Sequence, residues 1–317
     1  MSNDYQLLSV NKKQLLTPDV VLFDLIQPDR SPLPSFTPGA HITVKTPKGL
    51  PRSYSLCGMP SDNSRWQIAV KREPQGRGGS LSMFEELKEG DLLHVRPWLN
   101  QFELREDAQS YLFIAGGIGI TPIMSMMRHL SNQGKRNFQL IYCTRDETHT
   151  PFMDTLIQSD WSDRIRIHHD QGDPSRSIDL WPLLENPSGA DVYCCGPNAL
   201  MESVKDMTGH WPNECIHFES FGAAEQKHQE SQAFEVVLNS SGKKIQVPAE
   251  VSILDALKAN GVGVMSSCES GTCGSCRTGL ISGEADHRDF VLMDDEKDHC
   301  IMVCVSRARS NHLVLDL

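Results

Sequence analysis

The sequence predicts a multidomain β and α/β protein: an antiparallel barrel, a parallel α/β domain and a small β-grasp module in succession. The first hundred residues alternate short strand-like runs with Pro- and Gly-bearing turns, which is typical of a barrel. Near residue 110 the pattern changes to continuous apolar strands followed by helices, which indicates a parallel sheet. After residue 233 come a hairpin, a helix and a cysteine-rich loop, the order expected of a β-grasp fold.

Composition limits the class of protein. The chain has 317 residues, 39% of them apolar and 22% charged, so we expect two or three soluble globular domains. A net charge of −11 argues against a nucleic-acid partner. We find no signal peptide, and the most apolar stretch, Tyr111–Met127, holds too many Gly and Pro breakers for a membrane span. Ten cysteines without a secretion signal indicate a reducing, cytoplasmic location.

Each domain has its own set of expected elements. We assign the barrel to residues 1–105, the α/β domain to residues 106–222, a linker to residues 223–233 and the β-grasp module to residues 234–317. Expected strands in the first two domains are Val20–Leu25, His41–Lys45, Trp66–Lys71, Tyr111–Ala115, Gln139–Thr144 and Asp191–Cys195. Expected helices there are Leu81–Leu87, Pro122–Leu130 and Asn198–Met207.

The β-grasp module is predicted from a hairpin and a capped helix. Phe234–Leu238 and Lys243–Val247 form the expected hairpin. Ser252 begins a helix with Asp255 three residues later, the spacing of a capping box. Gly261 falls where a glycine would end that helix.

A cysteine cluster gives the strongest chemical signal. Cys268, Cys273 and Cys276 form C-x4-C-x2-C, and Cys304 follows after 27 intervening residues, which is the plant-type spacing of a [2Fe–2S] cluster. The alternatives are a zinc site or buried thiols, but zinc sites usually combine two short cysteine hooks. Cys300 competes for the fourth position, and the apolar, strand-like surroundings of Cys304 favour Cys304.

A glycine-rich turn follows the first apolar strand of the α/β domain. In Gly116–Pro122, glycine amides and a helix N-terminus are suited to a pyrophosphate, with Thr121 as the expected N-cap and Pro122 as the first helical residue. Pro122 replaces the third glycine of the usual dinucleotide pattern, so an ordinary tight turn stays open. The next strand ends at Thr144 and Arg145, and not at an isolated acidic residue that could bind a ribose.

Two runs in the barrel are candidates for holding a flavin. One is Arg52–Leu56, and the other is Arg77–Ser80, in which two glycines, an arginine and a hydroxyl precede a helix. The second run resembles an anion-binding nest that would suit a phosphate. Each run alone is better explained as a barrel strand or a turn, and it is their pairing in one domain that favours a flavin.

The chain resembles the phthalate dioxygenase reductase-type FMN/[2Fe–2S] oxygenase reductases over essentially its whole length. It is especially similar to reductase subunits of vanillate O-demethylases and carnitine monooxygenases. The matching segments are Arg52–Ser55, Gly76–Ser80, Gly116–Pro122, Tyr193–Pro197, Phe218–Gly222, the cysteine loop, Asp286–Asp289 and Cys304–Ala308.

This resemblance implies a flavin-binding β-barrel, a Rossmann-like NAD domain and a plant-type ferredoxin domain. It implies roles for residues in each. FMN would contact Arg52, Ser53, Tyr54 and Ser55, with the Ser55 hydroxyl facing flavin N5, and its phosphate would lie on Arg77, Gly78, Gly79 and Ser80. NADH would contact Gly117, Gly119, Thr121, Pro122, Thr144 and Arg145, with Cys195, Gly196 and Pro197 near the nicotinamide. Glu219 and Phe221 would border the flavin, and Cys268, Cys273, Cys276 and Cys304 would bind the cluster.

The implied activity is that of an NADH-dependent flavin and iron–sulfur oxidoreductase. Electrons would pass from NADH to FMN, singly to the cluster, and then to a Rieske-type oxygenase, without any catalytic acid, base or nucleophile from a side chain. FAD and NADPH are the less favoured cofactors, and Arg145 is suited to a 2′-phosphate. Two alternatives stay open: an electron-carrier ferredoxin with a non-functional flavin domain, and an FAD-type reductase serving another acceptor. The acidic segment Glu284–Asp298 is a candidate for steering the partner.

Overall fold

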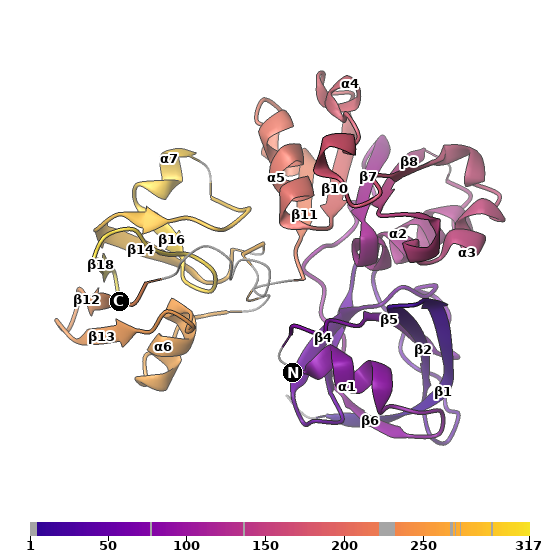
Figure 1. Ribbon diagram of the computed structural model, residues 1–317, viewed down its shortest axis with the longest axis horizontal. Helices are drawn as coiled ribbons and strands as arrows, with labels where there is room; N and C mark the ends of the chain where they lie inside the picture. Colours follow the sequence, from indigo (N-terminus) through magenta and orange to yellow (C-terminus); the bar gives the residue numbers. More distant parts are fainter. Residues whose placement is uncertain are drawn as a thin grey trace. The chain divides into compact units, whose positions relative to one another are not determined.

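The computed structural model divides into two compact units, Met1–Glu219 and Ser220–Leu317 (Figure 1). The structure describes residues 5–76, 78–135, 137–221, 232–266, 269, 271–272, 274–292 and 294–317. The predicted site residues Arg77, Cys268 and Cys273 and nearly all of the predicted linker lie outside these ranges. Within them, no helix combines the length and apolarity needed to cross a membrane.

The first unit begins with the predicted antiparallel barrel. Its six strands are ordered β4-β3-β6-β1-β2-β5, and all neighbours pair antiparallel. A bridge between Leu56 and Ile68 joins the end of β4 to β5, so the outer strands meet and the sheet closes. The elements are β1 (Gln6–Thr17), β2 (Val20–Ile26), β3 (His41–Lys45), β4 (Pro51–Ser55), β5 (Trp66–Lys71), α1 (Gly79–Glu85) and β6 (Leu92–Val95).

Helix α1 begins two residues before the predicted start. Gly78 adopts a left-handed conformation with φ 83° and serves as the N-cap, so the helix includes Gly79 and Ser80. Glycine accepts this backbone conformation without the steric cost that a β-carbon would bring. The sequence prediction placed both residues in the preceding turn because it took the glycine pair as a break.

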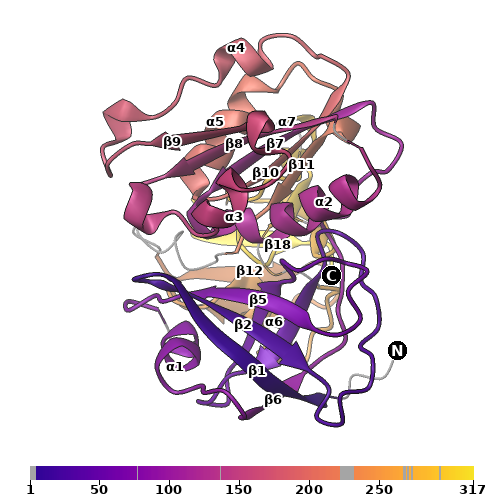
Figure 2. The same ribbon diagram turned by 90° about the vertical axis from the view of Figure 1, so that its right-hand side faces the viewer.

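A five-stranded parallel sheet follows in the same unit, in the order β11-β10-β7-β8-β9. Helices α2 and α3 cover the face nearer the barrel, and α4 and α5 cover the other face (Figure 2). The strand order reverses at β7, and ligands of such sheets bind beyond the carboxyl ends of the strands at this point. The elements are β7 (Ser110–Gly116), α2 (Ile120–Asn132), β8 (Phe138–Thr144), α3 (Met153–Ile157), β9 (Ile165–His169), α4 (Trp181–Leu184), β10 (Ala190–Cys195), α5 (Asn198–Met207) and β11 (Ile216–Glu219).

The two edge strands of this sheet, β9 and β11, were not among the predicted strands. The central strands β7 and β10 are buried almost throughout, which gave them continuous apolar sequences. In contrast, β11 is only partly buried, and β9 mixes isoleucine with arginine and histidine. An edge strand lacks the long apolar run that marks a central parallel strand.

The second unit has the β-grasp arrangement expected from its hairpin, helix and loop. A mixed sheet in the order β13-β12-β18-β14-β16 is accompanied by the β15-β17 pair. Ser252 caps α6 as predicted, its hydroxyl accepting from the Asp255 N–H at 3.0 Å. The elements are β12 (Phe234–Leu238), β13 (Lys244–Val247), α6 (Ile253–Ala259), β14 (Arg277–Ser282), β15 (Ala285–Asp286), α7 (Asp294–Lys297), β16 (Cys300–Met302), β17 (Arg307–Ala308) and β18 (His312–Leu315).

Candidate functional site

The turn between β7 and α2 packs against the turn that follows β10. A β-carbon on Gly119 would lie 2.1 Å from the Cys195 carbonyl oxygen, and one on Gly116 would lie 2.5 Å from Pro197. Gly117, in contrast, has φ 53°, and no atom of the described residues lies within 4 Å of where its β-carbon would stand. The turn is therefore closed on the side of Gly119 and open above Gly117. Such an open backbone surface is what a pyrophosphate needs.

The predictions of Thr121 as the N-cap of α2 and of Pro122 as its first residue are wrong. The helix begins at Ile120 with Gly119 as its N-cap, and no side chain caps it. The Thr121 hydroxyl is buried and donates to the Ile118 carbonyl at 3.0 Å. The short 3₁₀ turn Gly117–Gly119 feeds directly into the helix, which moves its start two residues toward the N-terminus.

Three functional groups meet where β4, β10 and β11 end. The Ser55 hydroxyl, at the end of β4 in the barrel, donates to Glu219 Oε2 at 3.3 Å. Glu219 ends β11, and its charge acts with burial to raise the pKa of Cys195 well above the ordinary thiol value. Register pairs Cys195 with Glu219 across β10 and β11. The barrel and the parallel sheet thus contribute to one site, with the Cys195 thiol held neutral.

The barrel side of this site has features that suit a flavin. The Tyr54 hydroxyl is buried without a hydrogen-bond partner among the described residues, and burial raises its pKa. A β-carbon on Gly79 would lie 2.8 Å from Arg52 Nε, so the missing side chain lets the guanidinium lie over the start of α1. Ser80 Oγ accepts from the Glu73 N–H at 3.2 Å, and Ser53 Oγ lies 3.1 Å from Thr43 Oγ1.

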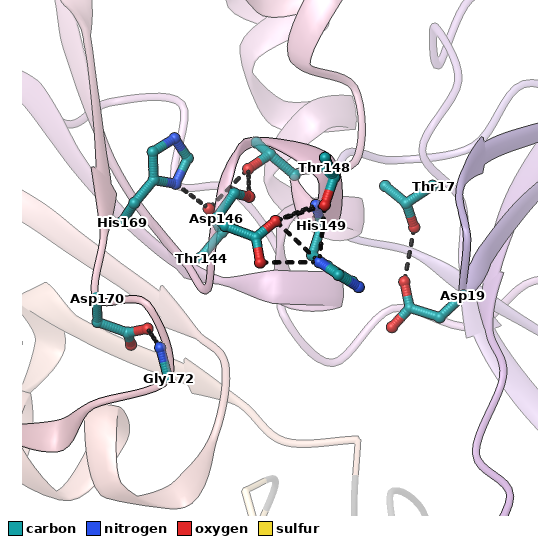
Figure 3. A network of polar contacts seen from close by, with 10 residues as sticks. Thr17, Asp19, Thr144, Asp146, Thr148, His149, His169, Asp170 and Gly172 are labelled. Atoms are coloured by element: carbon teal, nitrogen blue, oxygen red, sulfur yellow. Dashed lines mark hydrogen bonds and ion pairs between the residues drawn. The ribbon is translucent and has the colours of Figure 1, made fainter.

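At the carboxyl ends of β8 and β9, a polar network orders the loop that contains Thr144 and Arg145 (Figure 3). The Thr144 hydroxyl is buried and shared with Thr150 at 2.7 Å and with His169 Nδ1 at 2.9 Å. Asp146 accepts from the Thr148 hydroxyl and the His149 N–H, which lowers the pKa of Asp146 to about 2. Arg145 is exposed. In this loop, therefore, the protein itself engages the threonine and aspartate, and the arginine faces solvent.

The cysteine loop of the second unit combines buried sulfur with left-handed backbone. Cys276 and Cys304 are 3% and 5% exposed. Gly271 and Gly274 have φ 78° and 76°, and a β-carbon on Gly271 would lie 2.7 Å from Val305. Glycine accepts this left-handed backbone without steric cost, and plant-type clusters are held by cysteine thiolates at this spacing. The described part of this loop therefore fits an iron–sulfur cluster.

Cys300 and Cys304 differ in their surroundings. Cys300 lies in β16 opposite Gly279, and its sulfur accepts from Arg277 Nε at 3.3 Å. Cys304 lies in a turn just after β16, not in a strand as predicted, because β16 ends at Met302. In the β14–β16 register Arg277 pairs with Met302, so Cys276 and Cys304 lie beyond the same end of the pairing. This arrangement favours Cys304 as a ligand beside Cys276.

Sequence reasoning missed a charged cluster on strands β10 and β11 of the parallel sheet. Asp191 is 2% exposed and accepts from His217 Nε2 at 3.1 Å, and Arg105 Nη1 lies 3.3 Å from the same carboxylate oxygen. The His217 ring stacks on Tyr193 with centroids 4.3 Å apart. Arg105 belongs to the segment between the barrel and β7, so the cluster fastens that segment to the sheet. The acid inside an otherwise apolar strand was its only signal in the sequence.

Three family models match successive parts of the chain. They are an oxidoreductase FAD-binding domain over residues 7–103, an oxidoreductase NAD-binding domain over residues 113–206 and a 2Fe–2S iron–sulfur cluster binding domain over residues 236–309. The order confirms the predicted sequence of a flavin barrel, an NAD domain and a ferredoxin domain.

Relatives match over nearly the whole chain. A phthalate dioxygenase reductase from Burkholderia cepacia is 50% identical and aligns with 98% of this chain and 97% of its own. A carnitine monooxygenase reductase subunit from Escherichia coli (strain K12) is 39% identical, with 99% and 100% covered. A solved phthalate dioxygenase reductase, described as a modular structure for electron transfer from pyridine nucleotides to [2Fe–2S], has a TM-score of 0.76 at 50% identity, with 99% and 98% covered. The chain therefore belongs to the phthalate dioxygenase reductase family of flavin- and [2Fe–2S]-containing oxidoreductases.

Proposed function

We propose that this chain is the reductase component of a two-component Rieske-type oxygenase and passes electrons from NADH through FMN and its own [2Fe–2S] cluster to that partner. One observation carries the proposal: the Ser55 hydroxyl of the barrel contacts Glu219 of the parallel sheet, and Glu219 pairs with Cys195 on the neighbouring strand. A flavin lodged in the barrel and a nicotinamide lodged on the sheet would face each other at this point. When bound, NADH supplies a hydride, the flavin separates its two electrons, and the cluster carries them singly.

The barrel residues would hold and orient the flavin. The Tyr54 hydroxyl would find in it the partner that it lacks among the described residues. Arg52, over the start of α1, and residues Gly78–Ser80, with Arg77 beside them in sequence, would bind a terminal phosphate such as that of FMN. Ser53 would flank this site, and the Ser55 hydroxyl would face the reacting edge of the ring. FAD is the alternative, because the matching barrel family is described as FAD-binding.

The parallel sheet would position NADH. The open backbone at Gly117 and the start of α2 at Gly119 to Pro122 would take the pyrophosphate. Gly196 and Pro197 would shape the nicotinamide pocket beside Cys195, whose raised pKa keeps the thiol uncharged next to a hydride path. The Thr144–Arg145 loop would meet the far end of the nucleotide. Phe221, half exposed, would border the flavin.

The ferredoxin domain would deliver electrons outward. Cys268, Cys273, Cys276 and Cys304 would bind the cluster. Two relatives are named a phthalate 4,5-dioxygenase oxygenase reductase subunit and a carnitine monooxygenase reductase subunit, which supports an oxygenase as the acceptor. A third is named a vanillate O-demethylase oxidoreductase. The acidic segment that includes α7 would steer a basic surface of that partner. Charge reversal at Asp294, Asp295 and Glu296 should then weaken partner binding in a salt-sensitive way.

Two measurements test this proposal. Flavin released by denaturation should migrate with FMN on chromatography, whereas FAD would contradict the FMN assignment. The NADH-reduced protein, mixed without oxygen with an oxidised Rieske oxygenase, should reduce it at a catalytically competent rate. A fast reaction only with other acceptors would favour a reductase of another pathway. A protein that retains no flavin would favour the carrier alternative.

A further inference from the structure

Arg128 joins the helix that begins at the glycine-rich turn to the barrel. It lies in α2, and its guanidinium Nη1 donates to the Cys57 carbonyl at 2.6 Å and to Gln67 Oε1 at 3.1 Å. Cys57 lies two residues beyond the end of β4, and Gln67 lies in β5. Burial lowers the pKa of Arg128. A partly buried charged group thus makes a contact between two domains.

The contact continues into a buried carboxylate of the barrel. Gln67 Nε2 donates to Asp24 Oδ1 at 2.7 Å, and Arg65 Nη1 lies 3.0 Å from Asp24 Oδ2. Asp24 is 3% exposed. Removing charges from water costs more than such contacts usually return, so a network of this kind is weak evidence for stability. Its geometry, which fixes one element relative to another, is the more informative property.

Other residues of α2 also contact the barrel. The Gly39 N–H donates to the Ser125 hydroxyl at 3.0 Å, and a β-carbon on Gly39 would lie 2.9 Å from the Met126 methyl. One apolar cluster contains Ile123, Met124 and Met127 of α2 together with Val20, Cys57 and Ala69 of the barrel. Apolar packing alone tolerates small shifts, whereas directed hydrogen bonds fix the rotation and sliding of the helix.

We propose that Arg128 is a positioning residue for hydride transfer, because it fixes α2, which begins at the nucleotide-binding turn, to the barrel strand that ends at Ser55. This inference rests on the proposed function. Arg128 is eight residues from the first residue of α2, about 12 Å along the helix axis. Its partner Cys57 is two residues from Ser55. Arg128 therefore controls how far the two halves of the site stand apart and touches neither cofactor.

The test compares Arg128→Lys with Arg65→Lys in the full, cofactor-loaded chain. Arg128 Nη1 donates to both acceptors through N–H bonds whose directions are fixed by the planar guanidinium, and lysine keeps the charge but lacks these fixed directions. Arg65 undergoes the same change in the same network without touching α2. We expect Arg128→Lys to lower the limiting rate of flavin reduction by NADH about 10-fold or more, since misplacement by about 1 Å costs up to about 100-fold. The apparent dissociation constant of NADH should stay within about twofold, because the turn itself is intact.

A second readout does not depend on turnover. The Cys57 N–H donates to the Gln67 carbonyl at 2.9 Å, and loosening of Arg128 should speed hydrogen exchange of that amide in Arg128→Lys but not in Arg65→Lys. Gln67→Met removes one acceptor of Arg128 and also the donor to Asp24, but leaves the Cys57 carbonyl as the other acceptor. It should lower the rate by a smaller factor, and it serves if Arg128→Lys does not fold.

An unchanged limiting rate in Arg128→Lys or Gln67→Met overturns the proposal, as does an equal loss in Arg65→Lys. A loss of NADH affinity with an unchanged limiting rate would assign Arg128 to holding the turn instead and also overturns it. Failure of the proposed function looks different, because wild-type protein would then not be reduced by NADH at all, and the positioning role would fall with it.

Discussion

The two units of the molecule build their sites in opposite ways. In the first unit, the site is assembled from distant parts of the chain, with Ser55, Gly119, Cys195 and Glu219 brought together by a barrel and a sheet that share one apolar cluster. In the second unit, three of the four proposed cluster ligands, Cys268, Cys273 and Cys276, lie within nine residues of sequence, and the fourth, Cys304, lies in the turn after β16. A hydride requires two bound molecules in fixed contact, whereas a cluster requires only thiolates around one inorganic core. The first site thus depends on packing between domains, and the second depends on local ligands.

The largest effect should come from removing a thiolate in the second unit. Cys304→Ser should abolish nearly all of the cluster iron, because a serine hydroxyl replaces a thiolate ligand. Cys300→Ser should keep the iron, since the Cys300 sulfur faces Arg277. Iron analysis and visible absorbance of both purified variants measure the difference. If iron is lost only from Cys300→Ser, then Cys300 and not Cys304 is the fourth ligand. NADH should still reduce the flavin in both variants.

In the first unit, the sharpest disruption should be Gly119→Ala. The added carbon would overlap the backbone of Cys195, which cannot move as a flexible side chain can, so we expect a loss of at least about 2 kcal/mol of stability and much weaker NADH binding. Gly134→Ala is the matched control, because its φ of 71° is strained for alanine but nothing lies within 4 Å. That control should cost about 1 kcal/mol and leave NADH binding intact. Denaturant unfolding measures the stability of both variants, and NADH titration measures their binding. Equal loss of NADH binding in the two variants would show that the close packing of Gly119 on Cys195 does not matter for the nucleotide site.

A smaller effect is expected from Ser55→Ala. Loss of one hydrogen bond at the site should slow flavin reduction by NADH roughly 10-fold, equivalent to about 1.4 kcal/mol. Ser64→Ala removes an exposed hydroxyl of the barrel that bonds to Asp62 and should change nothing. Rapid mixing of each variant with NADH provides the measurement. An unchanged rate in Ser55→Ala would show that the Ser55 hydroxyl has no role in flavin reduction.

The smallest effect should be a pH dependence from His217. Burial lowers its pKa below the ordinary value of 6.5, with Asp191 opposing and Arg105 reinforcing the shift. The unfolded chain then binds more protons than the folded chain just below pH 6.5, so the stability of the first unit should fall as the pH drops through that range. His217→Phe should flatten this dependence in denaturant unfolding at pH 5 to 8, and His94→Gln, at an exposed histidine, should not. An unaltered slope in His217→Phe would show that another group is responsible.

Sequence reasoning succeeded where local pattern fixes structure. The strands His41–Lys45 and Trp66–Lys71, the helix Asn198–Met207 and the Ser252 cap are as predicted, because periodicity and capping act over a few residues. It failed at the starts of α1 and α2, where left-handed or 3₁₀ glycine turns join the helix, and at the edge strands β9 and β11. The Ser55–Glu219 contact and the Arg128 network join residues 164 and 71 positions apart, and no local pattern signals such pairs. The family resemblance brought Ser55 and Glu219 to attention but not Arg128.

The most direct test of the account is an anaerobic titration of the purified protein with NADH, followed by visible absorbance. We expect the flavin and iron–sulfur bands both to bleach, because electrons from NADH should pass through the flavin to the cluster. Bleaching of the flavin alone would contradict the assignment of the ferredoxin domain as the next carrier. If neither band responds although both cofactors are bound, NADH is not the donor and the proposed function is wrong.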